Sequence, residues 1–294
     1  MNLKTYLAET KSLIEDFLKM YFRQTGEPEV LFDAMRYSLF AGGKRIRPIL
    51  CLTAYETCGG VGTDILPQAC ALELIHTYSL IHDDLPAMDN DDLRRGKPTN
   101  HKVYGDAMAI LAGDGLLTES FRMFTTVAGD SGITKNILPA IKELASSAGL
   151  YGMVAGQALD IISEGKTPDK TTLEFIHKNK TAALLKTSVR LGGILYGAQK
   201  PEMSALSDYG EAIGLAFQVV DDILDVTGTT EELGKPQGSD DSKDKMTYPA
   251  MYGIERSKEI ARELITRGLE SAEFFKGKAM WLKEIANYLL KRTN

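Results

Sequence analysis

The sequence predicts an all-α fold, a single-domain helical bundle around a deep central cavity. Apolar residues recur at steps of three and four along most of the chain, and no segment bounded by turns alternates as a half-buried strand does. Turn-forming residues fall between the periodic segments, and no long linker rich in Gly, Pro or Ser divides them. We therefore expect one domain over residues 1–294.

Each periodic segment is long enough for a helix, and several exceed 20 residues, which suits a bundle with a cavity. The predicted helices are 3–22, 31–40, 66–85, 106–127, 136–162, 171–196, 203–227, 247–268 and 277–291. The turn signals between them are, in chain order, Gly59-Gly60, Gly96-Lys97-Pro98, Gly129-Asp130-Ser131-Gly132, Gly165-Lys166-Thr167-Pro168 and Lys200-Pro201. The punctuation thus agrees with the periodicity.

The acidic residues are concentrated in two short windows. The chain carries 34 Lys and Arg against 40 Asp and Glu, a formal net charge of −6. Residues 82–95 hold five Asp against two Arg, and residues 218–245 hold eight acids against three Lys. Carboxylates gathered in this way are more typical of cation binding than of a surface charged for solubility. The acidic balance also argues against a nucleic-acid partner.

Other features of the composition predict a cytoplasmic protein with reduced thiols. No stretch reaches the roughly 18 apolar residues of a membrane span. The first ten residues lack the apolar core of a signal peptide. The three cysteines, Cys51, Cys58 and Cys70, form no C-x-x-C, which disfavours a disulfide framework or a zinc site.

The first acidic window contains Asp83-Asp84-Leu85-Pro86-Ala87-Met88-Asp89 at the end of a long apolar segment. On a straight helix, Asp83 and Asp89 would lie about 120° from alignment. Pro86 disfavours helical geometry at Leu85 and donates no backbone hydrogen bond, so we expect a bulge or kink here. A bulge of this kind would bring the two carboxylates to one side of the chain.

The second window contains Asp221-Asp222-Ile223-Leu224-Asp225 within an uninterrupted helical pattern. Asp221 and Asp225 lie about 40° apart around the axis and share a face. Like charges at this spacing destabilise a helix by a few tenths of a kcal/mol, so a compensating cation is expected. Mg²⁺ fits, because it uses one or two carboxylates plus substrate phosphates. A single D-D-x-x-D would fit a solvated face equally well; two such motifs favour metal binding.

Basic segments accompany both acidic windows, as a phosphate site would require. The turn at 42–48 contains Lys44 and Arg47 and opens a helix, where free N–H groups favour an anion. Arg94-Arg95 follow the first window, and arginine suits bidentate phosphate contacts. A basic surface turn, or local pairing of the arginines with Asp91 and Asp92, remains the alternative. The other basic candidates are Lys178, Lys180, Lys235, Lys243 and Lys245.

These motifs, in this order, resemble those of the bacterial trans-prenyl diphosphate synthases, especially the farnesyl diphosphate synthases. The segment from Ala71 to Thr99 resembles the family's first Asp-rich motif, and Phe217–Asp225 resembles its second. The remaining matches are Gly42–Pro48, Gly113-Asp114, Gly156-Gln157-x-x-Asp160, Lys180-Thr181, Gly234-Lys235 and Lys245-x-Thr-Tyr-Pro249. The resemblance covers nearly the whole chain. It implies an isoprenoid-synthase-type fold, usually a homodimer, with the two Asp motifs facing across the mouth of the cavity.

The resemblance also implies roles for individual residues. The Mg²⁺ ligands, for several ions per site, would be Asp83, Asp89 and Asp221, supported by Asp84, Asp222 and Asp225. Isopentenyl diphosphate would be held by Lys44, Arg47, His76 and Arg95. The allylic diphosphate would be held by Arg94, Lys180, Lys235 and Lys245. Thr181 and Gln218 would point oxygens at the developing carbocation, and His76 could instead be an ordinary polar core residue.

Tyr78 is the candidate for control of product length. It lies five residues before Asp83, about 7.5 Å along the helix. In the farnesyl synthases that the sequence resembles, a bulky residue here forms a floor that stops elongation, whereas geranylgeranyl synthases tend to have a smaller one. The resemblance therefore favours condensation of isopentenyl diphosphate with dimethylallyl and geranyl diphosphate to farnesyl diphosphate. An ordinary buried aromatic is the alternative interpretation of Tyr78.

Three other functions compete with this one. A geranylgeranyl diphosphate synthase would share every motif except the residue at position 78. A class I terpene cyclase would replace the second D-D-x-x-D with an N-x-x-x-S-x-x-x-E pattern, which Asp221–Asp225 does not match. A non-catalytic subunit of a prenyl synthase would be expected to lose carboxylates or basic residues, and none is missing here.

Overall fold

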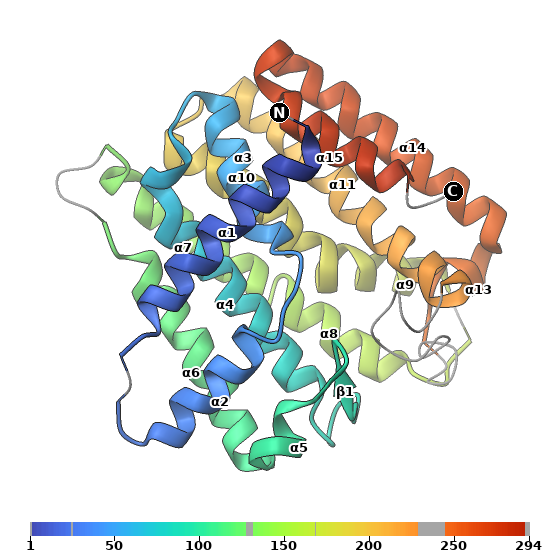
Figure 1. Cartoon of the computed structure of the whole chain (residues 1–294). Helices are drawn as coiled ribbons and strands as arrows, with labels where there is room; N and C mark the ends of the chain where they lie inside the picture. The colour runs from blue at the N-terminus through green and yellow to red at the C-terminus, as the bar shows by residue number, and fades with distance from the viewer. Residues whose placement is uncertain (1, 25, 128–131, 168, 229–244, 292–294) are drawn as a thin grey trace. The chain divides into compact units, whose positions relative to one another are not determined.

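The computed structural model of the chain describes all residues except 1, 25, 128–131, 168, 229–244 and 292–294 (Figure 1). These described residues are almost entirely helical, and their only sheet is a two-stranded hairpin of β1 (Leu93–Arg94) and β2 (Lys97–Pro98). The predicted all-α class is confirmed. The chain divides into two compact units, Met1–Ile49 with Ile65–Ser131 and Leu50–Asp64 with Gly132–Asn294. One domain over residues 1–294 and a deep central cavity stay predictions.

The first unit is built on α4, a helix that is buried around most of its circumference. Twelve of its 18 residues are buried, the pattern of a helix inside a core. It begins with Pro67 in its first turn and packs on α6. The His82 ring lies against Gly113 of α6, where a side chain would overlap it. The helices of this unit are α1 (Leu3–Tyr21), α2 (Glu29–Leu39), the start of α3 (Ile46–Cys58), α4 (Leu66–Asp83), α5 (Asn100–Tyr104) and α6 (Asp106–Phe124).

The second unit is built on α11, which runs for 28 residues. Pro201 occupies its first turn, and the Glu202 carboxylate accepts the Gln199 N–H at 2.6 Å, so the sequence itself specifies the helix start. Helices α10, α14 and η3 pack on α11. Besides the rest of α3, the elements are η1 (Gly62–Ile65), η2 (Thr134–Asn136), α7 (Ile137–Ala148), α8 (Met153–Ser163), α9 (Lys170–Ile176), η3 (His177–Ala182), α10 (Ala183–Tyr196), α11 (Lys200–Thr227), α13 (Tyr248–Tyr252), α14 (Ile254–Ala272), η5 (Glu273–Ala279) and α15 (Met280–Lys291).

Two predicted helices are each two helices in the structure. The segment 136–162 is interrupted between α7 and α8, where Gly149 and Gly152 adopt non-helical backbone angles. The segment 247–268 is interrupted at Gly253, whose φ of 77° separates α13 from α14. In both cases the apolar periodicity continues across a glycine that turns the backbone, so periodicity alone did not mark the break.

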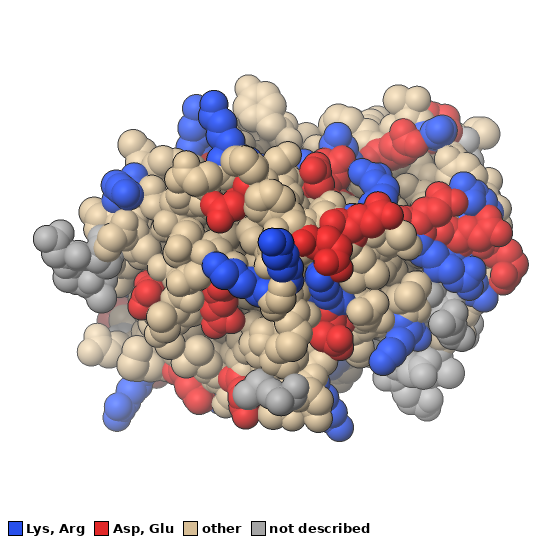
Figure 2. Space-filling view, turned by 90° about the horizontal axis from the view of Figure 1, so that it is seen from above, with Lys and Arg blue, Asp and Glu red and all other residues tan. Residues whose placement is uncertain are grey.

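The surface charges do not gather by sign in the view of Figure 2. Lys and Arg side chains lie there among Asp and Glu side chains. Nucleic-acid binding depends on a continuous basic face, which this view does not contain among the described residues. No helix in the described ranges is long and apolar enough to cross a membrane.

Candidate active site

The first aspartate motif lies where α4 ends and the chain turns back. The Asp89 N–H donates to the Asp83 carbonyl at 2.8 Å, and the Met88 N–H donates to the Leu85 carbonyl at 2.9 Å. The backbones of Asp83 and Asp89 are therefore adjacent, although six positions separate them. The interruption predicted from Pro86 is present, and it brings the backbone of Asp89 next to that of Asp83, which a straight helix would not do.

The second aspartate of this motif is paired within the protein. Asp84 is buried and accepts hydrogen bonds from Arg94, at 2.8 Å from Nε and also from Nη2. Burial raises the pKa of the Asp84 carboxyl to about 6, with Arg94 opposing that rise. Arg94 also lies 3.3 Å from Asp91, whereas Asp92 pairs with Lys102. The local pairing considered as an alternative role for Arg94 is therefore present with Asp91 and not with Asp92.

Four arginines surround His76 in the same unit, and we call Arg45, Arg47, Arg94 and Arg95 the arginine cluster. Burial and the charges of these four side chains hold the pKa of His76 well below its usual value of 6.5. The imidazole is therefore neutral at pH 7, and the cluster keeps its full positive charge around it. Lys44 is exposed on the loop beside this cluster. The structure thus brings Arg47, His76 and Arg95 together. Lys44 lies three residues before Arg47 in the chain.

Residues 42–47, a loop that runs into the first turn of α3 and that we call the 42–47 loop, lie against Arg95. Arg95 Nη1 donates to the Gly42 carbonyl. Gly43 has a φ of 125°, and a Cβ there would lie 2.8 Å from the Arg95 guanidinium. A side chain at position 43 would therefore push the loop away from the arginine.

Tyr78 is buried on α4 on the amino-terminal side of Asp83. Its ring is 7% exposed and stands edge-on to the His82 ring, with 5.7 Å between the centroids. Burial, with a contribution from the nearby Asp83 charge, raises the pKa of Tyr78 to about 12, so the hydroxyl is neutral. A neutral aromatic ring of this size is a suitable apolar barrier.

The second aspartate motif lies near the end of α11, and its three carboxylates have different environments. Asp221 is exposed, whereas Asp222 and Asp225 are each 2% exposed. On the helix face predicted for both residues, Asp221 is therefore exposed to solvent and Asp225 points into the interior. Asp222 accepts bonds from Gln218 Nε2 at 2.7 Å and from the Tyr248 N–H at 3.0 Å.

His177 is the third partner of Asp222, with Nε2 at 2.9 Å from the carboxylate. Burial alone would lower the pKa of His177, but Asp222 and the Leu173 carbonyl outweigh it and raise the pKa. Asp222 therefore joins α11 to η3 and to the start of α13. The amide N–H₂ group of Gln218 donates a hydrogen bond to Asp222, so its amide oxygen can accept a contact from another group.

Two lysines of the second unit share one buried carboxylate, and we call Asp160, Lys180 and Lys245 the lysine cluster. Lys180 Nζ lies 2.6 Å and Lys245 Nζ 3.9 Å from Asp160 Oδ2. Lys180 and Thr181 belong to η3, a π-helix, which is a local form often found at functional sites. Gly156 of α8 packs on the backbone of this π-helix, where a side chain would overlap it. Lys235 lies outside the described residues.

The donor set suits Mg²⁺ but does not form a closed metal cage. Asp83 and Asp89 are partly exposed and Asp221 is exposed. Carboxylate oxygens are the ligands that Mg²⁺ prefers, and it commonly completes its shell with water and substrate phosphates. Among the described residues, no group of three His, Cys, Asp or Glu side chains lies close enough to hold a metal ion alone.

The sequence did not single out Arg45, Asp160 or His177 for a function. Arg45 and Asp160 lie inside segments that match family motifs, but the substrate-binding roles were predicted for other residues of those motifs or for none. His177 precedes Lys180 by three residues, and its partner Asp222 is 45 residues away. No local pattern marks such a pair, so spacing could not have identified it.

An all-helical fold that carries two D-D-x-x-D-type motifs, each with its own basic cluster, defines a class of enzymes that handle diphosphates with metal ions. Residues 28–282 match the polyprenyl synthetase family model, and the chain belongs to this family. It is a short-chain prenyltransferase of the trans type, from a family that acts on isopentenyl and allylic diphosphates.

Individual relatives agree on the family but carry names for different products. The chain is 48% identical over 300 residues to a geranylgeranyl diphosphate synthase of Cyanophora paradoxa, covering 100% of this chain and 97% of that one. It is 51% identical over 260 residues to a farnesyl diphosphate synthase of Geobacillus stearothermophilus, covering 88% and 87%. The crystal structure of a geranyltransferase from Legionella pneumophila is similar, with a TM-score of 0.87, 32% identity and coverage of 99% and 97%.

Proposed function

We propose that the protein condenses isopentenyl diphosphate with dimethylallyl and geranyl diphosphate to give (2E,6E)-farnesyl diphosphate, with Mg²⁺ as cofactor. The observation that carries the product assignment is Tyr78, a buried aromatic one and a half turns before Asp83. A growing chain that starts at the metal-binding aspartates has only about 7.5 Å along α4 before it reaches this ring. The location in the cytoplasm and the homodimer stay predictions.

Two sets of basic residues would bind the two diphosphates, and Arg94 of the arginine cluster would belong to the allylic set. In the first unit, Lys44, Arg47, His76 and Arg95 would hold isopentenyl diphosphate, because positive side chains gather around His76, with Glu73 and Asp84 among the carboxylates that offset them. The allylic diphosphate would be held by Arg94, Lys180, Lys235 and Lys245. Guanidinium groups hydrogen-bond phosphate oxygens in pairs, and ammonium groups act as point charges.

Metal ions would be held by Asp83, Asp89 and Asp221. Bound Mg²⁺ would neutralise the diphosphate that leaves the allylic carbon. The lysine cluster would add positive charge to the same leaving group, since Lys180 and Lys245 converge on one carboxylate, Asp160. The buried partners Asp84 and Asp222 would serve as supports, because their oxygens are already bonded to protein donors.

The carbocation that forms on ionisation would be stabilised by oxygen dipoles. Gln218 has its N–H₂ group on Asp222, so its amide oxygen is the end available to a cation. Thr181 supplies a hydroxyl oxygen from the π-helix. The cation would then alkylate the double bond of isopentenyl diphosphate, and loss of a proton to the released diphosphate would complete the condensation. Apolar surroundings would exclude water, which would otherwise quench the cation as an alcohol.

One assay tests the function and another tests the product. Incubation with dimethylallyl or geranyl diphosphate, isopentenyl diphosphate and Mg²⁺ should give farnesyl diphosphate. No condensation by the folded, metal-supplied protein would favour a non-catalytic subunit, and a C20 product would favour the geranylgeranyl alternative, which the Cyanophora paradoxa relative also supports.

Tyr78→Ala should shift the products to longer chains, because it removes the ring that blocks elongation. The product mixture is analysed by chain length, with Tyr55→Phe as a control for substitution of a tyrosine elsewhere. An unchanged product length in folded Tyr78→Ala would contradict the role of Tyr78.

A further inference from the structure

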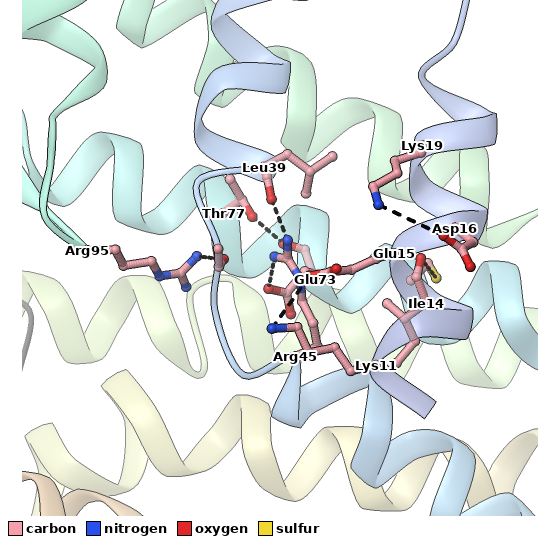
Figure 3. A network of polar contacts seen from close by, with 12 residues as sticks. Lys11, Ile14, Glu15, Asp16, Lys19, Leu39, Arg45, Glu73, Thr77 and Arg95 are labelled. Carbon is pink, nitrogen blue, oxygen red and sulfur yellow. Dashed lines mark hydrogen bonds and ion pairs between the residues drawn. The ribbon is translucent and has the colours of Figure 1, made fainter. Parts of the chain in front are cut away.

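Arg45 faces the interior of the first unit, although it lies between two residues proposed to bind substrate. It is 2% exposed. Its Nη1 donates to Glu73 Oε1 at 2.7 Å and its Nη2 donates to the Leu39 carbonyl at 2.7 Å. Figure 3 shows the guanidinium between these partners, with Glu15 approaching from α1. Arg45 is thus enclosed by the protein and is not placed to hold a substrate itself.

The backbone at Arg45 is held in an unfavourable conformation. Its φ is 53°, in the left-handed region that residues with a side chain rarely adopt. Such a conformation persists only where the surroundings impose it. The Arg45 side chain is held in this conformation by its buried bonds to Glu73 and to the Leu39 carbonyl.

The Arg45–Glu73 pair holds the 42–47 loop at Arg45, and Arg95 holds the same loop at Gly42. Arg95 Nη1 donates to the Gly42 carbonyl, whereas Arg45 Nη2 donates to the Leu39 carbonyl three residues earlier in the chain. Glu73 stands on α4 one turn before His76, and Thr77 Oγ1 donates to the Glu73 carbonyl at 2.8 Å. Lys44 and Arg47 are therefore tied to the helix that carries His76.

Helix α1 takes part in this network. Glu15 Oε1 lies 3.5 Å from Arg45 Nε, and Lys11 lies 3.8 Å from the same Glu15 oxygen. The Glu15 side chain is 25% exposed, so it is the outer and weaker member of the group. The Glu15 carboxylate of α1 thus supports Arg45, which holds the 42–47 loop.

We infer that Arg45 is a positioning residue for isopentenyl diphosphate: its buried ion pair with Glu73, supported by Glu15 of α1, fixes the 42–47 loop so that Lys44 and Arg47 are presented beside His76. This inference rests on the proposed function of the arginine cluster. It assigns Arg45 no contact with substrate, and it predicts an effect on one substrate only.

Arg45→Met tests the inference, because it removes the charge and both hydrogen bonds while keeping an unbranched side chain. Binding of isopentenyl diphosphate alone is measured by calorimetry, which needs no turnover, and KM is measured for both substrates. We expect the Kd and KM for isopentenyl diphosphate to rise about tenfold, equivalent to about 1.4 kcal/mol. The KM for geranyl diphosphate should stay within about twofold of the wild-type value.

Conservative and control variants separate positioning from general stability. Arg45→Lys keeps one donor for Glu73 but not the second for Leu39, so it should restore part of the affinity. Arg190→Met breaks an ion pair with Glu143 in the second unit and should leave the Kd for isopentenyl diphosphate unchanged. If Arg45→Met does not fold, Glu15→Gln removes only the outer partner and should raise that Kd about two- to threefold.

Different results would contradict the positioning role of Arg45 and the proposed function. Wild-type protein that forms no prenyl product contradicts the proposed function. With an active wild type, an unchanged Kd in folded Arg45→Met overturns the positioning role, as does an equal rise in KM for both substrates. An unchanged Kd in Glu15→Gln, where Arg45→Met is unfolded, also overturns it.

Discussion

The arginine cluster and the lysine cluster prepare positive charge in different ways. Arg45 lies on a loop, Arg47 in the first turn of α3, and Arg94 and Arg95 in the β1–β2 hairpin, with positive φ at Arg45 and Arg95. The guanidinium groups of Arg45, Arg94 and Arg95 donate hydrogen bonds to carbonyls and carboxylates. The lysines converge on a single buried carboxylate, Asp160, and one of them belongs to a π-helix. The first cluster is therefore fixed by many directional bonds, and the second by one shared charge.

This difference indicates which cluster depends more on a cation. Around His76 the positive charge comes from four arginines, of which Arg45 and Arg94 form ion pairs with carboxylates. In the lysine cluster, Asp160 already offsets part of the ammonium charge, and Asp221 adds another negative group in the same unit. We expect a diphosphate held by the lysine cluster to depend more on Mg²⁺, because two ammonium groups face these carboxylates there.

The paired aspartates have similar environments in the two units, and the largest predicted effects come from substituting the first aspartate of each pair. In each pair the first residue, Asp83 or Asp221, is accessible, and the second, Asp84 or Asp222, is buried and bonded. Asp83→Asn and Asp221→Asn should each lower kcat by about 10²–10³-fold, because each removes charge that would hold Mg²⁺ at the leaving group. Their unfolding free energies in urea should change less than that of the matched variant Asp222→Asn.

Asp222→Asn is the matched variant, and it should act on stability. It weakens a buried carboxylate that serves His177, Gln218 and the Tyr248 N–H, and breaking such a buried pair costs about 3–5 kcal/mol. Urea unfolding measures the loss. A lower kcat with an unchanged unfolding free energy would show that Asp222 is used as a metal ligand and that the two members of the pair are alike.

The aspartate motifs also show how far the sequence alone determines such a site. The spacing of Asp221 and Asp225 around their helix and the interruption at Pro86 follow from local rules of helix geometry and proline chemistry, and the structure contains that interruption. The all-helical class follows from periodicity in the same way. These features depend on residues close together in the chain, where spacing carries the information.

The supporting residues could not be predicted in this way. Arg45 meets Glu73 at a separation of 28 residues, Lys180 meets Asp160 at 20, and His177 meets Asp222 at 45. Each pair is decided by how helices pack, and no spacing rule specifies it. The glycines that divide 136–162 and 247–268 were missed for a related reason, since apolar periodicity continues through them.

A second prediction concerns the shared charge of the lysine cluster. Asp160→Asn should raise the KM for geranyl diphosphate or lower kcat by about tenfold, because Lys180 and Lys245 lose the anion that holds them. The KM for isopentenyl diphosphate should change by less than about twofold. Glu143→Gln, which removes the carboxylate partner of Arg190, is the control. If both KM values rise together, the two clusters are not independent.

The smallest effect concerns His76 and the pH dependence of stability. The native pKa of His76 is held well below 6.5 by burial and the arginines, while the unfolded chain should titrate near 6.5. Below that pH the unfolded state binds a proton that the native state does not, so the stability that the neutral imidazole contributes is lost as the pH falls.

For one proton, the loss of unfolding free energy between pH 6.5 and 5.5 is about 1 kcal/mol. His76→Gln should lack this component, so its unfolding free energy should fall by about 1 kcal/mol less than that of the wild type over the same interval. Urea unfolding at both pH values measures the difference, with His101→Gln as the control. Inorganic diphosphate offsets the arginine charges, and its addition should reduce the wild-type loss. Equal pH dependence in the wild type and His76→Gln would show that the arginines do not set the charge state of His76.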